Sequence, residues 1–276
     1  MPADKVSLTQ AVRGNLLTLQ RTATTIDQTQ TRLSTGLKVN SAIDDAAAFF
    51  TARALDNRAS DLDSLKSNID LAISTIQAAL DGIDAITDLV QQAKGLASNA
   101  KATGDTNERS TLAVQFNELL SQIDSIANDS TFNGINLLQA SPDNLDVVFN
   151  EDNTSNLTIT GLDTTTASTG INLGVAGNNF GANANIDTAL TAISTALVTL
   201  RGNASTLGSN STILKTRLDF TQNLVNTLEG GSGKLTLADL NEESANLLAL
   251  QTRQQLGLNS LSLAAQSERA ILSLFG

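Results

Sequence analysis

Apolar residues recur at steps of three and four along most of the 276-residue chain. This spacing places them on one face of an α-helix, so it predicts a set of long helices. The most regular run extends from Ile186 to Leu228, with Asn185 as its N-cap, and only Ser211 and Thr221 interrupt it. A second long run repeats every seven residues from Leu62 to Ala97. A shorter helix is predicted after a loop around Gly104; it carries Leu112 to Ile126 on one face and ends near Asn128–Ser130.

Both ends of the chain carry a helical apolar stripe. The N-terminal stripe has one polar position, Gln30, and consists of Val12, Leu16, Leu19, Ala23, Ile26 and Leu33. The C-terminal stripe consists of Leu240, Leu247, Leu258, Leu261, Ala265, Leu272 and Phe275. Thr236 is the predicted N-cap of this last helix, with Asp239 as the capping-box carboxylate. Gly230–Gly233 predicts a flexible joint before it. The two stripes together favour an antiparallel terminal coiled coil.

A two-helix pair leaves much of its apolar surface in water. Either the middle of the chain or other copies of the chain must therefore cover the terminal stripes. The expected division is a terminal-helix coiled-coil domain of residues 1–43 plus 235–276, and a helical bundle domain of residues 44–234.

The middle of the chain contains the one strand-like segment. Leu145–Phe149 and Asn156–Thr160 flank a polar turn and predict a β-hairpin within a region of about residues 142–185. The rest of that region, Thr164–Asn185, is predicted to be a loop poor in packing residues. The dipeptide Asn133-Gly134 predicts a turn that lets Phe132, Leu137 and Leu138 plug the bundle. The expected fold class is mainly α: a long-helix bundle with an antiparallel terminal coiled coil and a small β-hairpin region.

Charge and composition narrow the function classes. The formal net charge of −11 argues against nucleic acid and against an anionic membrane as partners. The chain has no His and no Cys, which removes the commonest general base, the commonest zinc ligand and any thiolate. An enzyme, a metal site and a cofactor are therefore not expected. The start of the sequence lacks a basic and then apolar signal-peptide pattern, and no apolar run reaches the length of a membrane span.

Residues 33–47, LSTGLKVNSAIDDAA, form the most distinctive motif. Gly36 and Asn40 are loop residues, Ser41 and Asp44 fit a capping box, and Asp44 and Asp45 place negative charge at a helix N-terminus. This motif, Phe132-Asn133-Gly134 with Leu137-Leu138, and the ending Ile271–Gly276 resemble, in that order, three signature stretches of bacterial flagellins. The chain is similar to short flagellins without large hypervariable outer domains.

The resemblance implies a structural subunit of the bacterial flagellar filament that self-assembles into a helical tubular polymer for motility. Both terminal helices would form the filament core. The resemblance also implies export through the flagellar type III apparatus, without a cleaved signal peptide, to the extracellular filament. Its implied partners are other copies of the chain, an export chaperone, the filament cap and hook-associated proteins. A hook–filament junction protein and a secreted helical binding or membrane-active protein are the alternatives.

In flagellins that an animal toll-like receptor senses, an Arg and a Glu on the outer-domain helices carry much of the recognition. By an ungapped reading the equivalent positions here are Gln92 and Gln115, whereas Leu96 matches. The resemblance therefore implies weak or absent receptor activation.

Overall fold

The computed structural model describes residues 10–275, except for the side chains of residues 11, 268, 269 and 271–275. The chain divides into two compact units, Met1–Arg58 with Thr227–Gly276 (unit 1) and Ala59–Asn226 (unit 2). The helices are α1 (Gln10–Thr35), α2 (Ala46–Ala102), α3 (Thr106–Asp129), α4 (Asn183–Thr236) and α5 (Leu240–Phe275), with a short 3-10 helix, η1 (Gly177–Phe180). The strands are β1 (Thr131–Phe132), β2 (Ile135–Asn136), β3 (Leu145–Val148) and β4 (Asn156–Ile159). The predicted fold class is confirmed.

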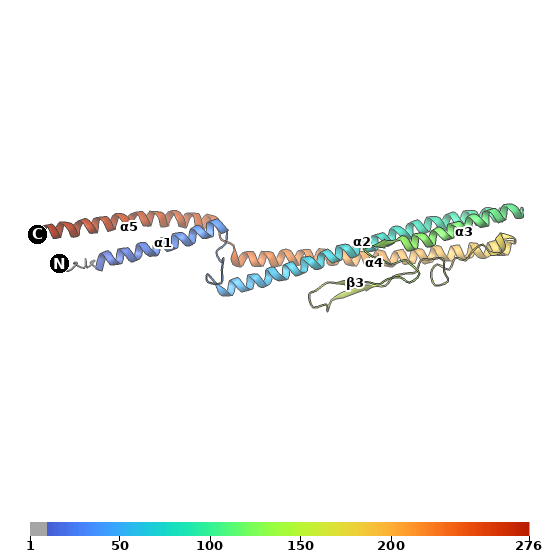
Figure 1. Cartoon of the computed structure of the whole chain (residues 1–276), viewed down its shortest axis with the longest axis horizontal. Helices are drawn as coiled ribbons and strands as arrows, with labels where there is room; N and C mark the ends of the chain where they lie inside the picture. Colours follow the sequence, from blue (N-terminus) through green and yellow to red (C-terminus); the bar gives the residue numbers. More distant parts are fainter. Residues whose placement is uncertain (1–9, 276) are drawn as a thin grey trace, which may run out of the picture. The chain divides into compact units, whose positions relative to one another are not determined.

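Unit 2 is a bundle of α2, α3 and α4 that encloses one apolar core (Figure 1). Its predicted seven-residue repeat is buried along α2, where Ile69, Ile76 and Ile83 are fully enclosed. Phe116 of α3 packs edge-on against Phe180 of η1, with ring centroids 5.2 Å apart. Helix α4 begins at Asn183, two residues before the predicted cap, and the Asn183 side chain accepts a hydrogen bond from Arg109.

Two antiparallel hairpins lie in unit 2. β3 pairs with β4 from Leu145↔Ile159 to Val148↔Asn156, so the predicted hairpin is confirmed. β1 and β2 are joined by Asn133 and Gly134, whose φ angles are 50° and 81°. Both residues are left-handed, as a type I′ turn requires, and Asn-Gly is the dipeptide that tolerates this best. The turn brings Leu137 and Leu138 into the core, where both are buried as predicted.

The segment Thr164–Asn185 packs far better than the sequence suggests. Ile171, Leu173 and Phe180 are buried in the core, so the prediction of a poorly packing loop is wrong. The reason lies in the hydrogen bonds of its threonines. The Thr166 N–H and hydroxyl both donate to Asp124 of α3, and the Thr164 hydroxyl donates to the Leu138 carbonyl. Once their polar groups are bonded, threonines can be buried at little cost.

Unit 1 pairs α1 with α5 in antiparallel orientation; they lie side by side in Figure 1. Backbone hydrogen bonds join the two ends that meet. The Ala238 N–H donates to the Gly36 carbonyl (2.9 Å) and the Lys38 N–H donates to the Thr236 carbonyl (2.8 Å). The predicted antiparallel terminal pair is therefore present.

The predicted boundary between the last two helices is wrong. α4 continues through Gly230–Gly233 to Thr236, because that turn of helix packs on the start of α2: Ser232 is buried, and a Cβ at Gly231 would lie 3.4 Å from the Leu55 side chain. Tertiary packing of this kind offsets the low helix propensity of glycine. Thr236 is thus the last residue of α4 and not an N-cap. Asp239 caps α5 instead, accepting hydrogen bonds from the N–H groups of Asn241 and Glu242.

Candidate functional site

The interface between α1 and α5 is the first part of the candidate site. Val12 and Ile26 are buried there, and Leu19, Ala23 and Leu33 are half-buried. On α5, Leu247 and Leu261 are half-buried. These predicted stripe residues therefore lie at or beside the helix–helix contact.

Other members of the predicted stripes face solvent. Leu16, Leu240, Leu258 and Ala265 are exposed, although the sequence predicts them at the interface. Leu272 and Phe275 fall within α5, but their side chains lie outside the described residues. The helices are turned about their axes relative to the prediction, so that a different set of positions meets.

Several residues at the contact between α1 and α5 are polar, and one is a glycine, although apolar residues are predicted there. Thr22 and Thr29 of α1 are buried, and Thr22 donates its hydroxyl to the Thr18 carbonyl. Glu243 of α5 is 8% exposed and pairs with Arg32 of α1, with Nη1 and Oε1 3.0 Å apart. At Gly257 a Cβ would lie 2.7 Å from the Leu19 side chain, so Leu19 fills the space that a larger residue would occupy.

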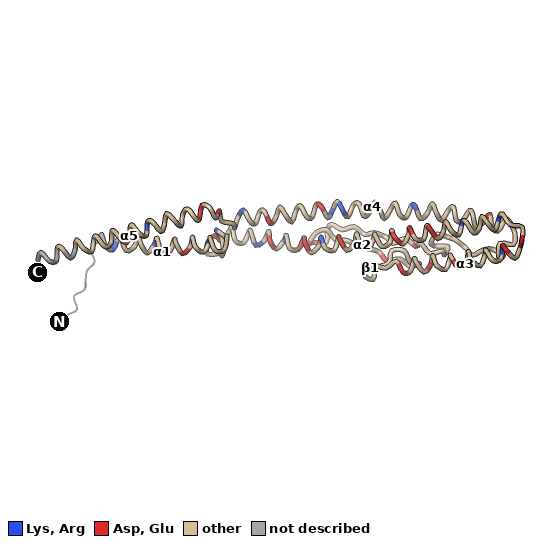
Figure 2. Tube along the Cα trace, turned by 90° about the horizontal axis from the view of Figure 1, so that it is seen from above, with Lys and Arg blue, Asp and Glu red and all other residues tan. Residues whose placement is uncertain are grey.

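Among the side chains that the structure describes, seven leucines on the outward faces of α1 and α5 are exposed, and we call them the outer leucines: Leu16, Leu17, Leu240, Leu248, Leu256, Leu258 and Leu263. The most exposed, Leu248 and Leu263, each leave 67% of their surface in water. The segment of α5 from Ser244 to Ser267 contains one charged residue, Arg253. In Figure 2 the trace of α5 therefore shows little red or blue along this segment. A long helix face that is rich in leucine and carries a single charge indicates an interaction surface.

Residues 36–45, which belong to the distinctive motif of the sequence, form the loop that connects α1 to α2. The Asp44 carboxylate accepts hydrogen bonds from the N–H groups of Asn40 and Ser41 and from the Ser41 hydroxyl, at 2.9–3.1 Å. The Ser41 hydroxyl, with these N–H groups, holds the pKa of Asp44 below its usual value. The predicted capping box is wrong in detail, because Asp45 caps α2 by accepting from the Ala48 N–H. Gly36 adopts a φ of +72°, which ends α1.

The three receptor-contact equivalents come together in unit 2. Gln92 and Leu96 of α2 and Gln115 of α3 line one shallow groove with Gly95 and Leu119. Gln92 and Gln115 are exposed, and both side chains end in neutral amides.

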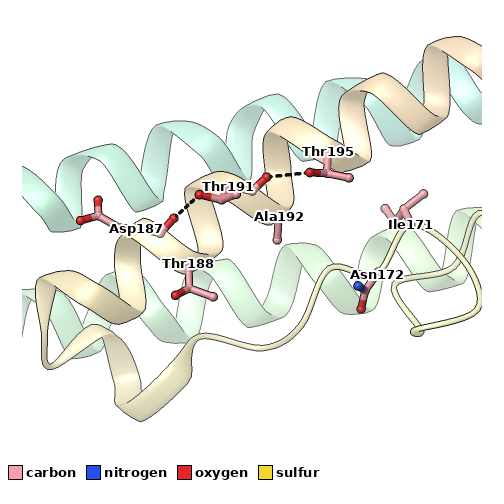
Figure 3. Close-up of a pocket in the computed structure, with 7 residues that line it drawn as sticks. All are labelled: Ile171, Asn172, Asp187, Thr188, Thr191, Ala192 and Thr195. Atoms are coloured by element: carbon pink, nitrogen blue, oxygen red, sulfur yellow. Dashed lines mark hydrogen bonds between the residues drawn. The ribbon is translucent and has the colours of Figure 1, made fainter.

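A second hollow in unit 2 lies between α4 and the loop around Ile171 (Figure 3). Thr191 and Thr195 line it, but their hydroxyls already donate to the carbonyls of Asp187 and Thr191. Its one carboxylate, Asp187, pairs with Lys101. The hollow therefore offers a ligand no free charged group among the residues that line it.

Comparison with known proteins identifies the family of this chain. Residues 6–143 match the bacterial flagellin N-terminal helical region, and residues 185–275 match the bacterial flagellin C-terminal helical region. The chain belongs to the bacterial flagellin family. It is 36% identical over 269 residues to flagellin FljM of Caulobacter vibrioides, covering 95% of this chain and 96% of that protein. It is 31% identical over 270 residues to a flagellin of Brucella melitensis, covering 94% and 95% of the two chains.

The crystal structure of Bacillus cereus flagellin superposes with a TM-score of 0.50 at 21% sequence identity, over 56% of this chain and 88% of that chain. This likeness shows the shared fold. As a flagellin, the chain is a structural subunit that polymerises into the extracellular flagellar filament. Among the residues described, no helix combines the length and the apolar character needed to cross a bilayer.

Proposed function

We propose that the terminal helix pair of unit 1 forms the filament core, and that the outer leucines are the contacts through which copies of the chain polymerise. The observation that carries this proposal is the set of seven exposed leucines among the described side chains of α1 and α5. Four of them, Leu248, Leu256, Leu258 and Leu263, lie in a stretch of α5 whose only charged residue is Arg253. A filament subunit has one abundant partner that can cover such a face, which is another copy of itself. Head-to-tail contacts that do not close produce a helical polymer.

The expected gain is large enough to drive assembly. Burying a leucine side chain contributes about 1.5–3 kcal/mol relative to full exposure, so covering a half-exposed leucine contributes about 1 kcal/mol. Together the outer leucines supply on the order of 5–10 kcal/mol per subunit before the entropic costs of association. Replacing Leu248, Leu256 and Leu263 with polar residues removes about half of this gain, because these three leucines carry about half of the exposed area of the set.

The predicted domain division follows from this role. Residues 1–43 plus 235–276 supply the core of the filament, and residues 44–234 supply the outer helical domain with its hairpin. The flagellin family supports, for this chain, export as an unfolded polypeptide without a cleaved signal peptide. It likewise supports transient partners in the export chaperone, the filament cap and the hook-associated proteins. Gly36, Asn40, Ser41, Asp44 and Asp45 form the ordered turn that joins α1 to α2.

The alternatives are not favoured. Flagellins that match over nearly the whole chain argue against a hook–filament junction protein and against a secreted membrane-active protein. A structural role accounts for the chain without catalysis, in keeping with the absence of His and Cys from its sequence.

The groove around Gln92, Leu96 and Gln115 supports a second part of the proposal, weak or absent activation of the animal receptor. Neutral amides replace both charged groups there, so charge-assisted hydrogen bonds to the receptor are lost. A reporter-cell assay with monomeric protein should give little signal, and Gln92→Arg with Gln115→Glu should raise it. Full activation by the unsubstituted monomer would refute this part.

The assembly proposal is tested by replacing Leu248, Leu256 and Leu263 with Gln in one chain. The three side chains are exposed, so helix content by circular dichroism should stay unchanged. After seeding with filament fragments, the pelleted fraction should fall severalfold, and electron microscopy should show few filaments. Val198→Gln is the control, because Val198 is similarly exposed (65%) but lies in unit 2. Normal filaments from the triple variant would overturn the proposal.

A further inference from the structure

Helix α1 can face α5 in two settings that differ by a rotation about the helix axis. Some residues lie at the contact in both settings, and the residues on either side of them form two flanks, of which one is turned inward in each setting. Val12, Leu19, Ile26 and Leu33 belong to both settings. One flank carries Leu16 and Ala23, and the other carries Thr22 and Thr29. The structure buries the threonines and leaves Leu16 40% exposed, although the leucine flank offers more apolar surface. Helix α5 shows the same preference, because Glu243 and Gly257 face α1 while Leu240 and Leu258 face solvent.

Hydrophobic burial within the pair does not account for this setting, so a specific contact must select it. Arg32 lies three residues after Thr29 and therefore on the threonine flank. Its contact with Glu243 turns that flank toward α5. The Glu243 side chain is only 11% exposed, so a roll of either helix that separates it from Arg32 leaves a nearly buried carboxylate without its cation.

A second contact acts in the same sense. Leu19 fills the notch at Gly257, where a Cβ would lie 2.7 Å from its Cδ2 atom. The notch accepts Leu19 only when Gly257 faces inward. The ion pair lies near one end of α1 and the notch lies farther along it, so together they hold the helix at two points.

We propose that Arg32 and Glu243, supported by the Leu19–Gly257 contact, set the rotation of α1 against α5 so that Leu16, Leu240 and Leu258 stay outside for a second copy of the chain. A polar contact that selects one arrangement over a more apolar one is documented for buried polar groups; here the buried partner is Glu243, since the Arg32 side chain is 42% exposed. This inference rests on the proposed assembly role of the outer leucines. Arg32 and Glu243 are positioning residues in it, because they act through the leucines.

Disulfide trapping reports the rotation directly, because the full chain contains no cysteine. Thr22→Cys with Gln254→Cys probes the observed setting: Thr22 lies three residues after Leu19 and Gln254 three residues before Gly257, so both are level in an antiparallel pair. Leu16→Cys with Leu258→Cys probes the alternative setting. The measured quantity is the ratio of the two intramolecular cross-link yields in filaments grown from a large excess of the parent chain that contains a small fraction of the double-cysteine variant.

The ratio should favour the Thr22–Gln254 pair in the parent chain and fall about tenfold with Arg32→Glu, since a shift of about 1.4 kcal/mol in a two-state equilibrium is tenfold. Arg32→Glu with Glu243→Arg should restore it, and Arg32→Lys should keep most of it. Gly257→Ala, which retains both charges, should lower it independently. Lys101→Glu is the control, since it removes an exposed ion pair in unit 2. An unchanged ratio, or an equal loss of both cross-links, would overturn the proposal.

Pelleting of the same variants separates this inference from the assembly role. If Arg32→Glu lowers both the cross-link ratio and the pelleted fraction, the results support both the orientation-setting role of Arg32 and Glu243 and the assembly role of the outer leucines. If the ratio falls while filaments form normally, the rotation is set as proposed but the outer leucines are not the polymer contacts. If filaments fail while the ratio stays unchanged, the orientation-setting role is refuted and the assembly role is not.

Discussion

Replacing Asn136 with Ala should destabilise unit 2 by several kcal/mol. Asn136 is 2% exposed, and its side-chain amide donates to the carbonyls of Ala127 (2.9 Å) and Asn128 (2.8 Å) at the end of α3. Its side-chain oxygen accepts from the N–H groups of Leu138 (2.8 Å) and Gln139 (3.1 Å). One side chain thus joins the end of α3 to the segment that carries Leu137 and Leu138 into the core.

The size of this loss of stability follows from the backbone carbonyls and N–H groups that lose their hydrogen-bond partner when the Asn136 side chain is removed. A buried donor or acceptor without a partner costs about 1–3 kcal/mol. The Ala127 and Leu138 bonds are fully buried and the other two are partly buried, so the sum is about 3–5 kcal/mol. Asn136→Asp should cost at least as much, because a carboxylate would face the two carbonyls that now accept hydrogen bonds.

Urea denaturation followed by circular dichroism at the helical band measures this loss. Asn156→Ala is the matched control, because Asn156 is exposed in β4 and its side chain makes one long hydrogen bond to Asn153 (3.4 Å). A loss below about 1 kcal/mol for Asn136→Ala, or equal losses for the two variants, would refute the reasoning.

Three further outcomes are expected. Gly82→Ala should lower the free energy of unfolding, measured by urea denaturation, by about 1–3 kcal/mol. The reason is that a Cβ there would lie 2.2 Å from the Ser130 hydroxyl and 2.8 Å from Leu138. Gly95→Ala is the control: a Cβ at Gly95 would meet open space, so this change should leave stability unchanged or raise it. Ser41→Ala should raise the pKa of Asp44 in a carboxyl-carbon NMR titration, since the Ser41 hydroxyl is the main cause of its low value. As the folded-state pKa lies below the unfolded value of about 3.9, the turn is stabilised above that pH and loosens as the pH falls through the lowered pKa; an unshifted midpoint in the variant contradicts this. Deletion of residues 240–276 should leave a folded helical bundle that forms no filaments, and pelletable polymer from that chain would contradict it.

The sequence predicts the bundle well because its signals are local. The seven-residue repeat in α2 and the strand alternation at β3 and β4 each depend on residues close in the chain. Asn133-Gly134 predicts its turn for the same reason, since the dipeptide itself tolerates the left-handed conformation.

The failures occur where distant contacts decide the outcome. Gly230–Gly233 stays helical because it packs against α2, and Thr164–Asn185 packs because Asp124 and Leu138 accept its hydrogen bonds. The inward face of the terminal pair differs from the prediction for the same kind of reason. Periodicity favours the more apolar flank, whereas Arg32 and Glu243, which lie at opposite ends of the sequence, select the other. A charged residue within a leucine-rich helix, such as Glu243, was the one available signal.

The position of the outer leucines in the assembled filament tests the central claim most directly. A reconstruction of the filament at side-chain resolution should show Leu248, Leu256 and Leu263 packed against neighbouring copies, with Arg32 still paired to Glu243 within each subunit. Leucines that remain in contact with solvent in the filament, while other surfaces join the copies, would contradict the account.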